Sequence, residues 1–186
     1  MKIEMTEIIK KRYFYLLITT LIIFVTIPVT AFSAQPADIS NHWAQEQIID
    51  WINRGLLGGY EDGTFRPDHN ISRVEFMALV NRVFKYQEKA DIDYTDVPDG
   101  VWYADVVKIA KAAGYISGYQ DGSIKPNHLI SRQEAAIIIM KVLGLEEYTP
   151  GASFQDASSI PGWSKGAVGA VAAAKIMGGY PDGTFR

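Results

Sequence analysis

Two serine–arginine pairs, placed alike in two copies of one motif, are the residues in this sequence that are best suited to bind a ligand. Residues 72–75 and 131–134 both read Ser-Arg-x-Glu, the pattern of a helix start in which Ser72 or Ser131 and a glutamate cap the first turn. Arg73 and Arg132 would then stand beside the free amides and partial positive charge of a helix N-terminus. Because a guanidinium can bind a carboxylate through two parallel hydrogen bonds, the motif predicts an anion site at two equivalent helix starts.

Aromatic and small residues could contact a ligand at the same places. Trp43, Trp102 and Trp163 recur at nearly equal intervals, and an indole offers a flat apolar face to a sugar ring. Small residues nearby would let the backbone come close to a ligand. These small residues are Gly58, Gly59, Ser117 and Gly118.

The same residues have structural interpretations, which the sequence leaves open. Tryptophans are usually buried to a large extent, so these three could belong to the core. The arginines could instead pair with Asp62 or Asp121 and hold a loop, although surface pairs contribute little stability. On the ligand-binding interpretation, replacing Arg73 or Arg132 by alanine weakens binding without unfolding the protein.

Composition excludes several other functions. The chain has 186 residues, a net charge of −3 and no cysteine, which argues against a nucleic-acid binder, a disulfide scaffold and a thiol nucleophile. A calcium loop with Gly63 at its sixth position would place Gly58 and His69 where carboxylates are required. His69 and His128 are equivalent loop residues, and no triad or isolated carboxylate pair accompanies them. We therefore expect no catalytic residues, no metal and no cofactor in this chain.

An internal repeat of about 60 residues supplies the elements that must position these residues. Glycine-rich loops begin at residues 59, 118 and 179, and each contains an Asp-Gly pair typical of a turn. Apolar residues at helical spacing predict a first helix over 43–54, 102–113 and 163–175, and a second helix beginning at residues 72 and 131. Asp38, Asp96 and Asp156, upstream of each first helix, are predicted as caps or loop ties.

The first 34 residues have the pattern of a secretory signal peptide. The basic cluster 10–12 precedes an apolar run over 13–29 and then small residues. Cleavage is expected after Ala31, Ser33 or Ala34, and we expect contact with a membrane only through this segment. The alternative is an uncleaved anchor, because a run of about 17 residues is at the short limit for a spanning helix.

Taken together, these motifs closely resemble the S-layer homology (SLH) domain. The resemblance rests on Trp-Ala at 43–44, Gly-Tyr-x-Asp-Gly-Thr-Phe-x-Pro at 59–67 and Ile-Ser-Arg-x-Glu at 71–75, and the pattern recurs after residues 92 and 152. Departures are the serine where the family usually has threonine and the missing arginine box of the third copy. It implies three repeats, at 36–86, 92–145 and 152–186, the last truncated. We therefore expect the front end of a longer protein, or a truncated one.

The resemblance also implies a fold and a function. The fold is all-α, with tandem helix–loop–helix repeats in a pseudo-threefold, three-pronged spindle whose third prong is incomplete here. The function is non-covalent anchoring of a secreted bacterial protein to the cell wall or S-layer, by binding secondary cell-wall polysaccharide, commonly pyruvylated, in association with peptidoglycan. The box arginines are implied ligand contacts. The parent could be a surface hydrolase whose catalytic domain lies beyond residue 186, or an S-layer lattice protein.

Overall fold

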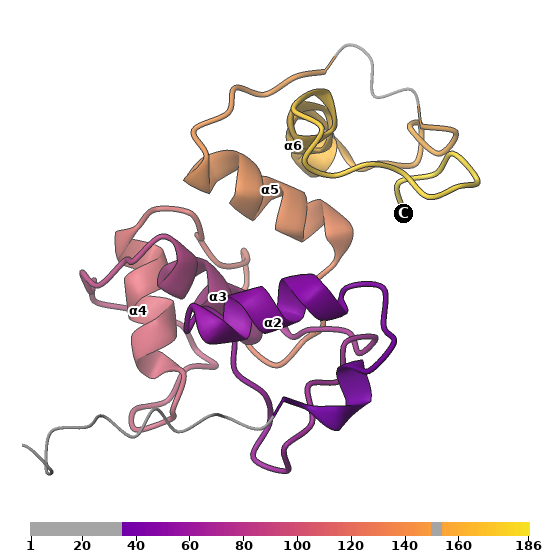
Figure 1. Cartoon of the computed structure of the whole chain (residues 1–186). Coiled ribbons are helices and arrows are strands. Elements are labelled where there is room, and N and C mark those ends of the chain that lie inside the picture. The colour runs from indigo at the N-terminus through magenta and orange to yellow at the C-terminus, as the bar shows by residue number, and fades with distance from the viewer. Residues whose placement is uncertain (1–34, 150–153) are drawn as a thin grey trace, which may run out of the picture. The chain divides into compact units, whose positions relative to one another are not determined.

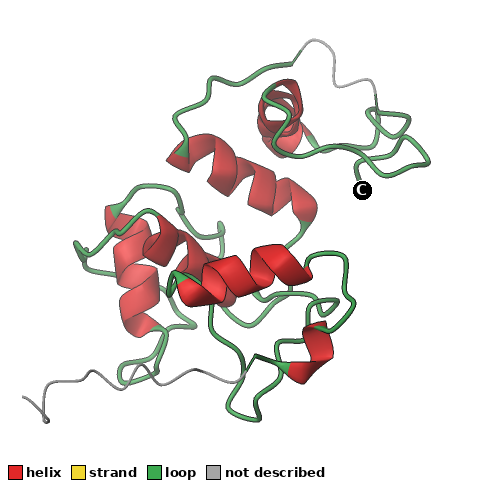
Figure 2. Ribbon diagram, viewed as in Figure 1, coloured by secondary structure: helices red, strands yellow, loops and turns green. Residues whose placement is uncertain are grey.

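The computed structural model describes residues 35–149 and 154–186, and this part of the chain consists of helices and loops (Figures 1 and 2). The all-α prediction is confirmed, while the threefold arrangement and the limits of the repeats stay predictions. The predicted signal segment lies outside the described residues. The elements are η1 (Ala37–Ile39), α2 (Gln45–Asn53), α3 (Arg73–Val83), α4 (Ala104–Ala112), α5 (Arg132–Val142) and α6 (Gly162–Ala173).

Helices α3 and α5 begin at the two predicted capping boxes. The Ser72 hydroxyl accepts the Glu75 amide at 3.3 Å, and the Glu75 carboxylate accepts the Ser72 amide at 2.8 Å. Ser131 and Glu134 make the same reciprocal pair at 3.2 and 2.9 Å. Such a cap stabilises a helix by about 1 kcal/mol, so these starts are fixed by local sequence.

The first helices of repeats 1 and 2 begin two residues later than predicted, because Trp43-Ala44 and Trp102-Tyr103 form turns ahead of α2 and α4. Two of the helices end as the sequence predicts. Gly55 and Gly144 follow α2 and α5 with φ of 68° and 62°, the left-handed conformation that glycine adopts without a steric penalty.

Packing between helices runs from one repeat to the next. Helix α3 packs against α4, and α5 packs against α6 (Figure 1). One core joins α3 to α4, the second loop and Ile138 of α5, and the other joins α5 to α6 and the third loop. The second helix of a repeat therefore covers the first helix and loop of the repeat that follows. The fully buried members include Val74, Met77, Val107, Ala110, Ile124, Ala136, Val168, Val171 and Phe185.

Small residues in α6 receive the linker between repeats 2 and 3. A side chain at Gly169 would collide with the Tyr148 carbonyl oxygen, and one at Gly166 would meet Glu147 at 2.8 Å. The Tyr148 amide donates to the Gly166 carbonyl at 3.1 Å. This close approach explains why α6 is rich in glycine and alanine.

Each loop is closed by the aspartate upstream of it, which confirms the predicted loop ties. Asp38 accepts the Phe65 and Arg66 amides at 2.9 and 2.7 Å, and Asp156 accepts the equivalent amides of repeat 3 at 2.8 and 2.9 Å. The Arg66 and Phe65 amides hold the pKa of Asp38 below its usual value. Within the loop, the Thr64 hydroxyl and amide and the Arg66 guanidinium lower the pKa of Asp62 to about 2. Charged hydrogen bonds thus hold each loop in one conformation.

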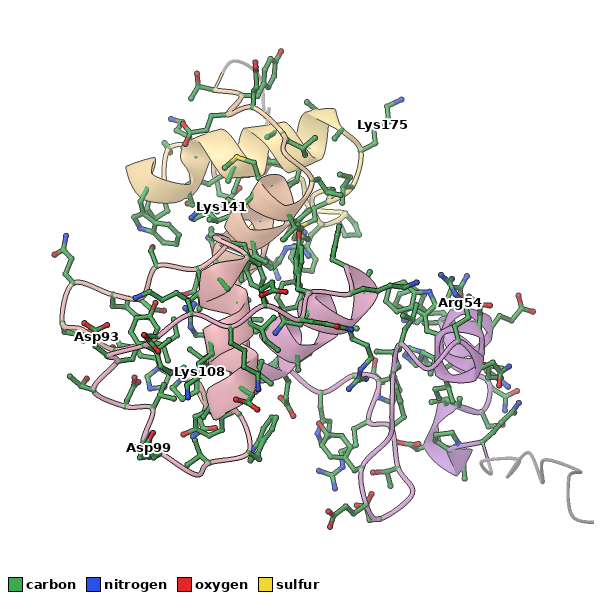
Figure 3. All side chains as sticks on the ribbon, turned by 90° about the vertical axis from the view of Figure 1, so that its left-hand side faces the viewer. Arg54, Asp93, Asp99, Lys108, Lys141 and Lys175 are labelled. Carbon is green, nitrogen blue, oxygen red and sulfur yellow. The ribbon has the colours of Figure 1, made fainter. Side chains whose placement is uncertain are left out.

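Charged side chains are exposed on every repeat. Arg54, at the end of α2, and Lys175, just after α6, project away from the ribbon (Figure 3). Over the ranges described, no helix has the length and apolar character needed to cross a bilayer.

Candidate functional site: the inter-repeat arginines, the exposed tryptophans and the α2 cleft

Arg73 lies at the first position of α3, as predicted, but its side chain is buried at a junction between repeats. The residue is 7% exposed. Its Nε donates to the Ile124 carbonyl at 2.9 Å and its Nη1 donates to Glu134 Oε1 at 2.7 Å. The guanidinium lies over the Tyr119 ring, 4.8 Å from its centre. Arg73 therefore joins α3 to the loop and to the capping box of repeat 2.

The Glu134 carboxylate forms an ion pair with Arg73 and also caps its own helix. Its carboxylate also accepts the Tyr119 hydroxyl and the Ser131 amide. Burial acts to raise the pKa of Glu134, but hydrogen bonds from Tyr119 and Ser131 and the charge of Arg73 outweigh it and leave the pKa lowered. The carboxylate is therefore held ionised beside the guanidinium. Burial and the bond to Glu134 raise the pKa of Tyr119 to about 12.

Arg132 occupies the same place one repeat later. Its Nε donates to the Phe185 carbonyl at 3.0 Å and its Nη2 donates to the Gly178 carbonyl at 2.6 Å. The guanidinium also lies over the rings of Tyr180 and Phe185. Both box arginines thus hold the loop of the following repeat, and their contact with a ligand stays a prediction.

The loop partners anticipated for these arginines were wrong. Asp62 pairs with Arg66 at 2.6 Å, and Asp121 pairs with Lys125 at 3.8 Å. These are pairs within one loop, four residues apart. The arginine of the box instead reaches a loop about 50 residues further along the chain, a distance that no local pattern reveals.

The three tryptophans lie at the surface, so the core interpretation was wrong. Trp43, Trp102 and Trp163 are 87%, 67% and 61% exposed, and each stands at or just before the start of the first helix of its repeat. Exposure of so large an apolar side chain is unusual, and its recurrence at one place in each repeat is typical of an interaction surface.

A cleft of about 630 Å³, here called the α2 cleft, lies beside α2. It is bounded by α2, the loop 57–67, α3 and Trp102, which precedes α4. It brings together four of the predicted site residues, Trp43, Trp102, Gly58 and Gly59. The remaining predicted residues are not among the residues that line it: Ser72, Arg73, Ser117, Gly118, Ser131, Arg132 and Trp163.

The glycines of the cleft differ in what they permit. A side chain at Gly59 would meet the Thr64 carbonyl at 2.7 Å, whereas one at Gly58 would meet nothing within 4 Å. At Gly118, the equivalent of Gly59, a side chain would meet the Tyr94 ring at 2.6 Å. Gly59 and Gly118 are therefore required by the loop itself, and Gly58 is the glycine that leaves room for an approaching group.

Several residues of the cleft were missed by the sequence analysis as site residues. Its lining includes the apolar residues Ile48 and Trp51 and the polar residues His42, Arg66 and Arg82. Trp51, on α2, is 36% exposed. The His42 ring bonds Asp68 at 3.1 Å, and Arg82 donates to the Leu56 carbonyl at 2.9 Å. The lining of the cleft therefore combines apolar side chains with two guanidinium groups. In the described part of the chain, no cluster of three or more histidines or carboxylates could hold a metal ion.

Comparison with known proteins identifies the repeats. The S-layer homology domain model matches residues 37–77, 93–136 and 153–186. Exoglucanase XynX of Acetivibrio thermocellus is 32% identical over 155 residues, which are 80% of this chain and 14% of that protein. The Surface-layer 125 kDa protein of Lysinibacillus sphaericus is 27% identical over 83% of this chain and 13% of its own length. A cellulosome-anchoring protein of A. thermocellus is 34% identical over 55% of this chain and 24% of its own length. The chain thus spans a small part of each relative.

Proposed function

Because the chain belongs to the S-layer homology domain family, whose members serve in anchoring at the bacterial cell surface, we propose that its ligand is an acidic secondary cell-wall polysaccharide. The chain is a cell-envelope module, and its relatives include surface-layer and cell-wall proteins. The single observation that carries the proposal is the exposure of Trp43, Trp102 and Trp163 at equivalent places.

The exposed indoles suit a sugar better than a peptide or a nucleic acid. A polysaccharide repeats along its length, so a chain with the same ring on each repeat can bind several sugar units at once, and linked weak contacts give high avidity. Trp43 and Trp102 both border the α2 cleft, and Gly58, which also lines it, leaves room for an approaching ring. The net charge of −3 argues against a general attraction for polyanions.

An acidic substituent, such as a pyruvyl group, would be recognised by hydrogen-bond donors held at fixed positions beside the cleft. Arg66 and Arg82 border the cleft, and a guanidinium binds a carboxylate in a fixed geometry. We propose that Arg73 and Arg132 act as positioning residues, since each holds a loop through two hydrogen bonds. Ser72 and Ser131 would act in the same way, through the helix starts that they cap.

We propose no catalytic role for this module; the protein that it anchors is a second question. Relatives named Exoglucanase XynX and Amylopullulanase share the module, and this favours an enzyme as the anchored protein. Other relatives are named as surface-layer proteins, so an S-layer lattice protein remains the alternative to an anchored enzyme.

The test is co-sedimentation with purified cell walls, native and chemically stripped of secondary polysaccharide. We expect the chain to sediment with native walls and to stay in solution with stripped walls. Replacing Trp43, Trp102 and Trp163 together by alanine should weaken binding at least about tenfold. Tyr148→Ala is the matched control, because this aromatic side chain is 45% exposed at a place that the repeats do not share.

Two results would contradict the proposal: equal sedimentation with stripped walls, or full binding by the triple tryptophan variant. A third arm uses walls whose polysaccharide lacks pyruvyl groups. Undiminished binding there would overturn the acidic-substituent part of the proposal and leave the polysaccharide part standing.

A further inference from the structure

One histidine holds the turn that presents Trp43. The Ala44 amide donates to His42 Nδ1 at 3.2 Å, a hydrogen bond here called the His42 clamp. The Nε2 of the same ring lies 3.1 Å from Asp68 Oδ1, so the ring joins the turn before α2 to the loop before α3. Trp43 lies between the two residues of the clamp and is 87% exposed. His42 therefore fixes the backbone from which this indole projects.

The two bonds of the ring determine where it carries its proton. A backbone amide can only donate, so Nδ1 must be the acceptor and must be without a proton. Nε2 then carries the proton and donates it to the ionised Asp68 carboxylate, which can only accept. The clamp therefore requires the neutral form of the His42 ring, with each nitrogen in a defined role.

Protonation of the ring would remove the clamp. A protonated imidazole has two N–H donors and no acceptor, so an Nδ1–H would face the Ala44 amide proton. The contact with Asp68 would gain charge, but this carboxylate is 82% exposed, and exposed ion pairs contribute little. An imidazolium also attracts the face of an indole, and the rings of His42 and Trp43 are already 5.4 Å apart. A proton would thus release the turn and occupy the indole face that a sugar would use.

Other charged groups share the α2 cleft with His42 and bear on its protonation. Among the described residues that line the cleft they are Tyr60, Arg66, His69, Glu75 and Arg82. The two guanidinium groups oppose a further positive charge, and the carboxylate favours it. His69 is the one member of this set that ordinarily changes charge in the same pH range as His42, so it requires a control of its own.

Repeats 2 and 3 have no titratable side chain at the place of His42. Val101 and Gly162 stand directly before the tryptophans of those repeats, and neither has a side chain that can accept a hydrogen bond. Their turns are closed by backbone bonds instead, from the Ala104 amide to the Val101 carbonyl at 3.1 Å and from the Ser164 amide to the Pro161 carbonyl at 3.0 Å. The chain therefore carries one indole on a proton-sensitive turn and two on turns without such a group.

We propose that His42 is a positioning residue that makes the contact of Trp43 with the wall polysaccharide dependent on pH. The neutral ring holds the turn and the protonated ring releases it, so repeat 1 binds less well as the pH falls through the range in which histidine ordinarily gains a proton, about 8 to 5. Repeats 2 and 3 keep their contacts over this range. The clamp stands on geometry within the chain, and only its effect on binding rests on the proposed function.

Three variants separate the role of the proton from that of the hydrogen bond. His42→Asn keeps an acceptor, because an asparagine side chain bonds the backbone amide two residues further on, and it cannot gain a proton. His42→Ala removes the acceptor and the proton together. His69→Asn removes the other histidine of the cleft and leaves the clamp in place.

NMR spectroscopy of the full chain tests the clamp in the absence of any wall. At pH 8 the ring nitrogens of His42 should show the proton on Nε2. As the pH is lowered to 5, the Ala44 amide resonance should move with the same midpoint as the ring, and its protection from hydrogen exchange should fall. In His42→Asn the Ala44 amide should stay protected throughout. A neutral ring with its proton on Nδ1, or an Ala44 amide that does not follow the ring, would overturn the clamp.

Co-sedimentation with native walls at pH 7.5 and pH 5.5 tests the effect on binding. Because one hydrogen bond is lost, the unaltered chain and His69→Asn should bind about threefold to tenfold more weakly at the lower pH. His42→Asn should bind equally at both pH values, and His42→Ala should bind weakly at both.

Three results would overturn the role of His42 in binding. They are a loss at pH 5.5 that His42→Asn shares, a loss that His69→Asn abolishes, and stronger binding at pH 5.5. The last result would show that the imidazolium itself attracts the acidic polysaccharide. Absence of wall binding at both pH values would refute the proposed function and with it the effect on binding, whereas the NMR titration would still decide whether the clamp exists.

Discussion

Replacing Arg73 by alanine should destabilise the protein strongly, because its guanidinium is buried in a junction between two repeats. The side chain is 9% exposed and its partner Glu134 is 18% exposed. Breaking a buried pair by removing one partner costs about 3–5 kcal/mol, since the other charge stays buried without its counter-ion. Glu134 keeps its bonds from Tyr119 and the Ser131 amide, so we expect a loss near the low end, about 3 kcal/mol.

Equilibrium unfolding in urea measures this loss. With a slope of about 2 kcal/mol per molar urea, a loss of about 3 kcal/mol lowers the midpoint by about 1.5 M. The matched control is Arg66→Ala, whose ion pair with Asp62 is exposed, with side chains 39% and 50% accessible. Exposed pairs contribute about 0–1 kcal/mol, so the midpoint of the control should move by no more than about 0.5 M.

A double-mutant cycle with Glu134→Gln isolates the pair itself. Because the two groups are in contact, we expect a coupling free energy of about 1–3 kcal/mol. Equal, small losses for Arg73→Ala and Arg66→Ala would refute the assignment of Arg73 to the repeat junction. So would a coupling near zero between Arg73 and Glu134.

Two further predictions concern the loops. Because the pKa of Asp62 is lowered to about 2 and that of Asp38 is also lowered, their contribution to stability is complete above the unfolded value near 4. It is lost as the pH falls toward 2, so urea midpoints should drop between pH 5 and pH 2, and a flat profile would contradict the loop ties. Gly59→Ala should cost about 1–3 kcal/mol, because its new methyl group would meet the Thr64 carbonyl at 2.7 Å. Gly58→Ala, with open space around it, should leave the thermal midpoint nearly unchanged, and equal shifts for the two variants would refute this reading of the loop.

The features that could be predicted from sequence are those set by near neighbours in the chain. Ser72 and Glu75 are three residues apart, so the capping box and the start of α3 follow from local pattern alone. The turn at Asp62-Gly63 is local in the same sense. The contact between Asp38 and the loop spans 27 residues. It could still be predicted, because the aspartate recurs at nearly the same distance from the loop in all three repeats.

The features that could not be predicted depend on which repeat packs against which. Arg73 and Glu134 are 61 residues apart, and nothing in either box shows that the first arginine belongs with the second glutamate. Helical spacing of apolar residues predicts a helix, but an apolar face is buried only where a neighbouring element covers it. No helix among the described elements packs on α2 as α3 packs on α4, and Trp51 is accordingly 36% exposed.

Helix α3 buries its apolar face against the repeat that follows it, and this changes where the chain divides into units that can fold. The segment that encloses the first core runs from the cap at Ser72 into α5, which contributes Ile138, so it is out of phase with the sequence motif. A cut at the linker near residue 90 would separate α3 from α4 and expose the apolar faces of both helices to water. For truncation or grafting, the better place to cut is the exposed stretch before Ile71, ahead of the first residues of that core.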